Sequence, residues 1–343
     1  MSGLPIQHPL ISVIITCYNR RNFLSKSIES VLSQKTDREN IEIIVTKNFK
    51  DDLLDSIIKQ NGIFSILEND IGIGLMIYNA TKAARGEYIC FLDDDDLFYD
   101  QKLNRAKQVI VSHPGLMYYH NAFNSIDDSG KELTDLRHKH PSSTVILDKN
   151  NPGPSIRNAR KLSGDVNMSS ITLKRDLIVS NADRLIQITG LQDVFMFFLA
   201  SATEGTMIID SAVLTGYRIH SSESHSDMTQ LEAYSSGLRA VTLKYLRTYE
   251  VLITIKGRQW KEVKYEYITN KCRYNLLARS DGKKLSIWEI LYLLFHLTYA
   301  ENKRNQVTLI GFTILRLFCP SHISSLYIKQ KMKFEKSKYV MNE

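Results

Sequence analysis

Short apolar runs alternate with segments of helical spacing along the first two thirds of the chain. Residues 10–17 form a continuous apolar and β-branched run, which is typical of a strand buried on both faces. After it, apolar residues between 23 and 32 recur at helical spacing, and the same order of strand and helix returns over 41–58 and 64–85. This alternation predicts an α/β fold with a mostly parallel, doubly wound (Rossmann-like) sheet.

The pattern continues to about residue 210 and then changes. We expect strands at 88–92, 116–125, 169–173 and 207–210, helices at 101–112 and 194–202, and a long loop rich in Pro, Gly, Asn and Ser over 135–165. From 231 onward the spacing is helical. The sequence therefore predicts a domain over 1–230 and a helical C-terminal region over 231–343.

Four consecutive aspartates, Asp93 to Asp96, follow directly on the apolar run 88–92. In an open α/β sheet, the carboxyl ends of the strands are where ligands bind. Alternate aspartates at such an end can hold Mg²⁺ or Mn²⁺, and a cation held there can neutralise the phosphates of a nucleotide. The alternative is a cap for the helix that begins near Gln101, but capping needs one carboxylate and does not explain four.

The net charge of +7 is distributed unevenly along the chain. Residues 1–234 carry 24 basic and 29 acidic side chains, a net charge of −5, whereas residues 235–343 carry 20 and 8, a net charge of +12. This asymmetry predicts an acidic partner for the C-terminal region, either a membrane surface or a polyanion.

The C-terminal region has two apolar stretches, 286–299 and 307–319, and both are shorter than the ~20 residues that a membrane-spanning helix needs. Lysines alternate with aromatic residues between 327 and 339. One interpretation is a peripheral platform on an anionic membrane surface, and the other is a small helical bundle with a solvated basic surface. Because the aromatic residues form no recognised nucleic-acid-binding module, we expect no nucleic acid partner.

No paired metal-ligand spacing relates the four cysteines, which are Cys17, Cys90, Cys272 and Cys319. We interpret them as reduced thiols of a cytosolic protein rather than as a disulfide framework. The N-terminus has no basic region before its first apolar stretch, so no secretory signal is expected. The sequence predicts a cytoplasmic protein, with peripheral attachment to the cytoplasmic membrane face as its one membrane role.

Four motifs occur in an order that resembles the family 2 glycosyltransferases, which have the GT-A fold. They are ISVIITCYNR at 11–20, GEYICFLDDDD at 86–96, IDDSGK at 126–131 and YRIHSS at 217–222. The resemblance implies a metal-dependent, inverting enzyme of the hexosyltransferase type. Such an enzyme moves a sugar from a nucleoside diphosphate sugar to a hydroxyl of a glycan or lipid-linked glycan. The loop over 135–165 is then a candidate acceptor lid.

The resemblance also implies roles for the individual aspartates. Asp93 would face the ribose or a metal-bound water, and Asp95 would ligate Mn²⁺ or Mg²⁺ at the diphosphate. Asp94 falls on the variable position of the motif, beside the nucleotide sugar, and Asp96 lies just beyond it, near the acceptor side. The cation would stabilise the departing nucleoside diphosphate as negative charge develops on it.

Residues at two other strand ends would complete the donor site. By resemblance, Thr16, Tyr18 and Arg20 line the pocket of the nucleotide base; the alternative is that they are ordinary residues of a strand-end loop. Arg218 would lie near the diphosphate and His220 would approach the metal. For a lone histidine, a structural role is the alternative.

An inverting transferase also needs a general base that takes the proton from the attacking hydroxyl. The family places an acidic residue at the start of a helix well after the aspartate motif, and Asp193 occupies that place here. The same residue could equally be a helix N-cap. The family often has two acids where this chain has Gln192 and Asp193.

The chain departs from the family pattern after its second strand. An acidic, glycine-containing segment is usual there, whereas Val45 leads into TKNFKDD, with Lys47 near the expected acid. The sequence therefore leaves the nucleotide base of the donor undetermined. A non-catalytic nucleotide- or sugar-binding scaffold is one rival interpretation. A nucleotidyltransferase is another, but residues 18–22 contain none of the glycines that such an enzyme places after its first strand.

Overall fold

The structure is a computed structural model, and it describes part of the chain. The described residues are 9–36, 40–69, 72–134, 138–148, 155–219, 231–278, 282–283, 285–300 and 302–340, with the side chains of 334–340 left out. The chain divides into two compact units, Met1–His220 (unit 1) and Ser221–Glu343 (unit 2). Each unit is described by itself.

The described residues of unit 1 form one nine-stranded sheet in the order β3-β2-β1-β4-β8-β6-β9-β5, with β7 paired to β9. The strands are β1 (Ile11–Cys17), β2 (Ile41–Lys47), β3 (Phe64–Leu67), β4 (Tyr88–Asp93), β5 (Leu97–Phe98), β6 (Leu116–Ile126), β7 (Val145–Leu147), β8 (Ile171–Lys174) and β9 (Thr206–Arg218). β1 is parallel to β2 and β4, whereas β8 is antiparallel to β4 and β6. The predicted α/β fold is confirmed.

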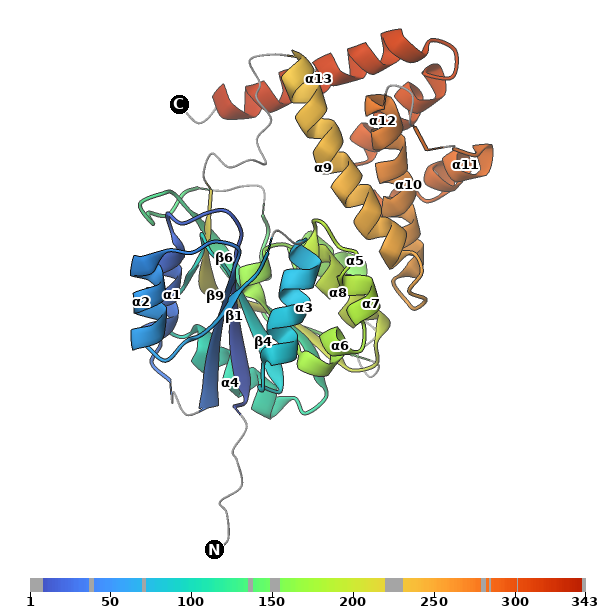
Figure 1. Ribbon diagram of the computed structural model, residues 1–343. Coiled ribbons are helices and arrows are strands. Elements are labelled where there is room, and N and C mark those ends of the chain that lie inside the picture. Colours follow the sequence, from blue (N-terminus) through green and yellow to red (C-terminus); the bar gives the residue numbers. More distant parts are fainter. Residues whose placement is uncertain are drawn as a thin grey trace, which may run out of the picture. The chain divides into compact units, whose positions relative to one another are not determined.

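Helices cover both faces of this sheet (Figure 1). They are α1 (Leu24–Leu32), α2 (Asp52–Gln60), α3 (Ile73–Ala83), α4 (Lys102–Ser112), α5 (Ile156–Lys161), α6 (Arg175–Val179), α7 (Ala182–Leu185) and α8 (Gln192–Ala202). All seven residues of β1 are buried, as the apolar run predicted. Val13 and Ile15 belong to a core that also holds Leu24 of α1 and Leu103 of α4. The first strand is thereby fixed at the centre of the unit.

Two expectations about unit 1 need correction. The segment 135–165 is not a loop throughout, because it contains β7 and α5; residues 135–137 and 149–154 lie outside the described part. The last strand begins one residue before the predicted 207–210 and extends to Arg218. Register irregularities between β6 and β9 interrupt the alternation of apolar and polar residues, so the pattern hid the strand's second half.

Unit 2 is helical, with α9 (Leu231–Leu252), α10 (Trp260–Leu277), α11 (Ile287–Phe295), α12 (Lys303–Leu315) and α13 (Pro320–Val340). Its core gathers around Ile268, Cys272 and Leu276 of α10, against which Leu293 of α11 and Ile310 of α12 pack. Within the residues described, no helix combines the length and the apolar character that crossing a membrane requires.

Candidate active site

The aspartate motif lies at the carboxyl ends of β1 and β4. The parallel register sets Thr16 opposite Asp93, and the Thr16 hydroxyl donates to Asp93 Oδ1 over 3.1 Å. Because β1 and β4 are central strands, the aspartates emerge from the middle of the sheet edge. This is where an open α/β sheet binds its ligands.

Arg20 faces two of the aspartates. Its Nη2 donates to Asp94 Oδ1 and its Nη1 pairs with Asp95 Oδ2, each over 2.5 Å. The Asp94 carboxylate is 2 % exposed and also accepts from the thiol of Cys17 over 3.0 Å, whereas Asp95 is 13 % exposed. The structure thus brings Arg20 against the acidic motif, and its predicted contact with the nucleotide base stays a prediction.

Asp96 is held in the interior, 1 % exposed. Its Oδ2 accepts from the hydroxyl of Ser169 over 2.6 Å, and its Oδ1 accepts from the backbone N–H of Arg218 over 2.8 Å. Ser169 also accepts from the backbone N–H of Asp93 over 2.9 Å. These hydrogen bonds fix the position of the aspartate motif. The placement of Asp96 on the acceptor side stays a prediction.

The clustering of carboxylates changes their acidity. Burial raises the pKa of Asp94 to about 6, while the Arg20 guanidinium opposes the rise. Burial, followed by the negative charge of neighbouring aspartates, raises the pKa of Asp93 and of Asp96 above the usual range. Added positive charge would relieve the repulsion between the aspartates, and the Arg20 guanidinium supplies part of that charge.

The residues at this edge fit a divalent cation. Within the described part of the chain, no three His, Cys, Asp or Glu side chains converge as a full ligand set. However, Mg²⁺ is ordinarily held by one or two carboxylates together with substrate phosphates. Asp93 and Asp95 offer that donor type, and the Arg20 guanidinium against Asp95 shows that a positive charge is accommodated there.

Arg218 ends β9 beside the same motif and is 3 % exposed. Its Nε donates to the backbone oxygen of Asp95 over 2.6 Å, its Nη1 donates to that of Asp127 over 2.5 Å, and its guanidinium lies 4.5 Å from the centre of the Phe23 ring. Its Nη2 has no hydrogen-bond partner among the residues that the structure describes. A buried donor of this kind fits an anionic oxygen. His220 lies outside the described residues.

Asp193 lies in the first turn of α8, and the N-cap of that helix is Leu191, so the N-cap interpretation of Asp193 is wrong. Its Oδ2 accepts from the backbone N–H of Asn167 over 3.0 Å, and its Oδ1 accepts from that of Val194 over 2.8 Å. Burial raises its pKa to about 6, and the charge of Asp165 adds to the rise. A carboxylate with such a pKa is suited to accept a proton near neutral pH.

The segment Asn167 to Ser169 connects Asp193 with the aspartate motif, and no motif or periodicity in the sequence pointed to it. The backbone of Asn167 donates to Asp193, its side chain accepts from Ser169 N over 2.9 Å, and the Ser169 hydroxyl reaches Asp96. Since β8 is antiparallel to β4, its leading residues necessarily lie beside the carboxyl end of β4. Only this topology could have revealed the segment.

Backbone strain also concentrates here. Four residues other than glycine have a left-handed φ in the described part of the chain, and three of them flank the site: Asn19 at +58°, Asn167 at +73° and Leu191 at +54°. Such conformations cost of order 1–3 kcal/mol and cluster at functional sites. Leu191 and Asn167 fix the backbone on the two sides of the Asp193 carboxylate.

The carboxyl ends of β1 and β2 lie at the same edge of the sheet as the aspartate motif. Tyr18 is 40 % exposed there, and Asn19 and Asn48 are joined by two hydrogen bonds of 2.8 Å. Lys47 is buried, where it pairs with Asp55 over 2.8 Å and donates to the backbone oxygen of Phe49 over 2.6 Å. Lys47, which occupies the place where the family usually has an acid, thus forms a structural ion pair.

Replacing Ser169 by Ala tests whether its hydrogen bonds to Asp93 and Asp96 stabilise the protein. The change removes both an acceptor for Asp93 N–H and a donor to the buried Asp96, so we expect the free energy of unfolding to fall by about 1–3 kcal/mol. Urea unfolding followed by circular dichroism measures this loss. Ser201→Ala is the matched control, a buried serine of α8 whose hydroxyl donates to the backbone oxygen of Phe198. If the free energy of unfolding fell equally in the two variants, Ser169 would have no special role in holding the aspartate motif.

Comparison with known proteins identifies the class. Residues 12–170 match the family model described as glycosyl transferase family 2. An uncharacterized glycosyltransferase of Rickettsia bellii is 33 % identical over 140 residues, 40 % of this chain but 20 % of the relative. An uncharacterized glycosyltransferase of Rickettsia typhi is 27 % identical over 255 residues, 73 % of this chain and 76 % of the relative.

Two solved structures share the fold. Staphylococcus aureus TarS 1-349, in complex with UDP-GlcNAc, is similar with a TM-score of 0.51 at 14 % identity, over 88 % of this chain and 90 % of that one. The mannosyltransferase PcManGT from Pyrobaculum calidifontis, in complex with GDP-Man and Mn²⁺, is similar with a TM-score of 0.53 at 13 % identity, over 92 % and 89 %.

The fold is therefore of the GT-A type, and the protein is a glycosyltransferase. Within the N-terminal unit, residues 12–170 are similar to glycosyl transferase family 2, as the sequence motifs predicted.

Proposed function

We propose that this chain is a metal-dependent, inverting glycosyltransferase that uses a nucleoside diphosphate sugar. The observation that carries the proposal is the pairing of two acidic centres through one short segment: the aspartate motif at the end of β4 and Asp193 at the start of α8. One centre suits a cation and a diphosphate, and the other suits a proton acceptor. An inverting transfer requires both functions.

Both acidic and basic side chains would bind the donor. Asp93 and Asp95 would ligate Mn²⁺ or Mg²⁺, with His220 as a further ligand, and the cation would supply charge stabilisation for the departing diphosphate. Arg20 and the buried Arg218 would face the phosphate oxygens, Arg218 through the Nη2 that has no partner in the described part. Thr16, Tyr18 and Asp94 would complete the nucleotide-sugar site.

The chemistry would proceed as a single displacement. The acceptor hydroxyl oxygen attacks the anomeric carbon while Asp193 takes its proton, and the bond from that carbon to the diphosphate oxygen breaks. The proton remains on the Asp193 carboxyl until it passes to solvent. The acceptor would be a glycan or a lipid-linked glycan, with Asp96 and the segment 138–148 on the acceptor side.

The donor nucleotide can be identified by titration calorimetry with UDP, GDP and CDP, each with and without Mn²⁺. UDP-GlcNAc in TarS and GDP-Man in PcManGT show that proteins of this fold bind different bases. Because Lys47 and Asp55 form an ion pair where the family has an acid, we do not carry over a base from either protein. We expect one nucleotide to bind with Mn²⁺ and to bind at least about tenfold more weakly without it.

Absence of binding of all three nucleotides to folded protein would contradict the proposal. That result would favour the non-catalytic scaffold, for which the altered end of β2 is the supporting observation. Nucleotide binding that is unaffected by Mn²⁺ or Mg²⁺ would contradict the metal dependence alone.

A further inference from the structure

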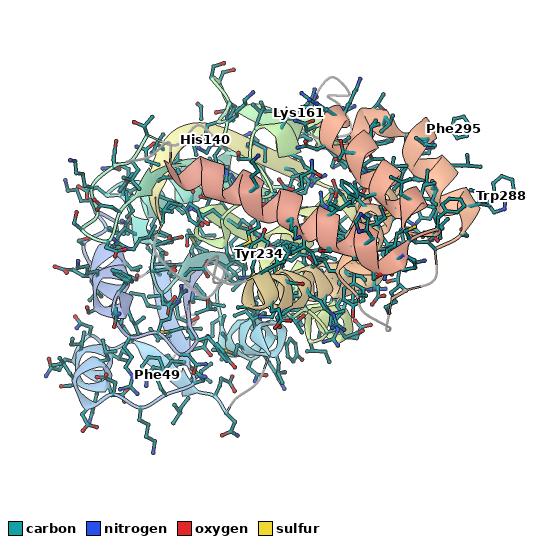
Figure 2. The ribbon with its side chains drawn as sticks, turned by 90° about the horizontal axis from the view of Figure 1, so that it is seen from above. Phe49, His140, Lys161, Tyr234, Trp288 and Phe295 are labelled. Carbon is teal, nitrogen blue, oxygen red and sulfur yellow. The ribbon has the colours of Figure 1, made fainter. Side chains whose placement is uncertain are left out.

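Helix α11 of unit 2 is apolar on its outward face as well as on its inward face. Ile290 and Leu293 are buried and pack in the core of the unit. On the outside, Ile287 is 62 %, Trp288 76 % and Phe295 81 % exposed. Figure 2 shows the side chains of Trp288 and Phe295 projecting away from the ribbon. A surface helix ordinarily carries polar residues on its outer face, so this face indicates a binding partner.

Basic residues of α10 border this apolar face. Lys264 Nζ lies 4.4 Å from the centre of the Tyr292 ring of α11 and 5.1 Å from that of Trp260. Lys256 Nζ lies 4.2 Å from the same Trp260 ring. Residues 256–273 carry six basic and two acidic side chains. Positive charge therefore lies immediately beside the exposed apolar side chains.

A hollow of about 590 Å³ lies between the two helices. It is lined by Lys264, Lys271, Leu285, Ser286, Trp288, Glu289 and Tyr292. Its one acidic side chain, Glu289, is neutralised by Lys271 over 2.7 Å and is tied to the helix start by a capping box with Ser286. The hollow thus combines an aromatic wall with a lysine amine whose charge the Glu289 carboxylate does not cancel.

We propose that α11 and the adjoining part of α10 dock on a bilayer containing anionic lipids. Trp288, Ile287 and Phe295 would enter the interface between headgroups and acyl chains, and Lys264 would meet a headgroup phosphate in the hollow. A second copy of the chain fits less well, because two such faces would bring like-charged lysines together. The C-terminal third, with its net charge of +12, adds long-range attraction to the same surface.

The proposal does not depend on the donor or on the acceptor of the transferase, because docking is measured without either. Full-length protein is mixed with vesicles of phosphatidylcholine alone or of phosphatidylcholine with phosphatidylglycerol, and the bound fraction is measured by sedimentation. We expect binding to the anionic vesicles only, with a partition coefficient that falls as NaCl is raised.

Two variants test the residues. Trp288→Ser combined with Phe295→Ser should lower the partition coefficient at least about tenfold, because both apolar anchors are lost. Lys264→Gln should lower it about fivefold. Leu53→Ser and Lys59→Gln on α2 are the matched controls, since Leu53 is 72 % exposed and Lys59 is also exposed. Both controls should bind as wild type does.

Three results would overturn the proposal. They are equal binding to neutral and anionic vesicles, binding unchanged by the double serine variant, and no binding by folded protein. If sedimentation velocity without vesicles showed a dimer that Trp288→Ser dissociates, the face would be an interface between copies, and the lipid proposal would also fail.

Discussion

Asp193→Asn is expected to lower the turnover number by about 10²–10⁴-fold while donor binding stays unchanged. Asparagine has nearly the same shape and can still accept from the backbone N–H of Asn167 or of Val194, so the local fold is retained. What is lost is the capacity to take a proton. Release of nucleoside diphosphate measures turnover, and calorimetry with the donor nucleotide measures binding.

The matched control is Asp176→Asn, which changes an exposed aspartate in the first turn of α6. This variant should turn over as the wild type does. A wild-type rate in Asp193→Asn would show that another group takes the proton, and the assignment of Asp193 would then be wrong.

The pH profile gives a second readout of the same residue. Because burial raises the pKa of Asp193 to about 6, the carboxylate is protonated below that pH and cannot act as a base. Turnover should therefore fall as pH decreases through about 6. Asp165→Asn should move this acid limb to lower pH, because the charge of Asp165 contributes to the raised pKa of Asp193. An acid limb that Asp165→Asn leaves unmoved would contradict the assignment.

Asp95→Ala is expected to weaken metal-dependent nucleotide binding by about 100-fold or more, since a cation ligand at the diphosphate contributes several kcal/mol. The fold should survive the change. The contact of Arg218 with residue 95 uses the backbone oxygen, and Arg20, 41 % exposed, keeps its bond to Asp94. Calorimetry with the preferred nucleoside diphosphate, with and without Mn²⁺, measures the effect.

Asp100→Ala serves as the control for Asp95→Ala. Asp100 is close in sequence but 66 % exposed, and it pairs with Lys35 at the surface, so its loss should leave nucleotide binding unchanged. If Asp95→Ala bound the nucleotide and Mn²⁺ as tightly as the wild type, Asp95 would not be a metal ligand.

The parallel half of the sheet could be predicted because its central strand is buried on both faces. Such a strand leaves a continuous apolar run, which the sequence shows over β1 and, before the aspartates, over β4. Exposure differs within the motif, which leaves the strand after Asp93: Asp94 and Asp96 are buried, whereas Asp93 and Asp95 retain exposure. The predicted roles of Asp93 and Asp95 at the ribose and the metal fall on the exposed pair, whereas Asp94, predicted beside the nucleotide sugar, is one of the buried pair.

The half of the sheet that holds β6, β8 and β9 resisted prediction for a different reason. The irregular pairing of β6 with β9 breaks the period-two pattern, so the path of β9 to Arg218 was not visible. Asn167 and Ser169 sit in a short turn without periodicity, and their importance comes from an antiparallel strand that begins beside β4. Contacts between strands so distant in sequence are set by topology, which local patterns do not encode.

The Asn167 to Ser169 segment also bears on how new specificities could arise on this scaffold. The spacing between the aspartate motif and Asp193 is set by one three-residue stretch, through the backbone N–H of Asn167 and the short side chains of Asn167 and Ser169. Residues 138–148 and α5 lie outside that stretch. In the proposed enzyme they could be redesigned for a different acceptor while the aspartate motif and Asp193 keep their separation, which would make substrate range and reaction chemistry separately evolvable.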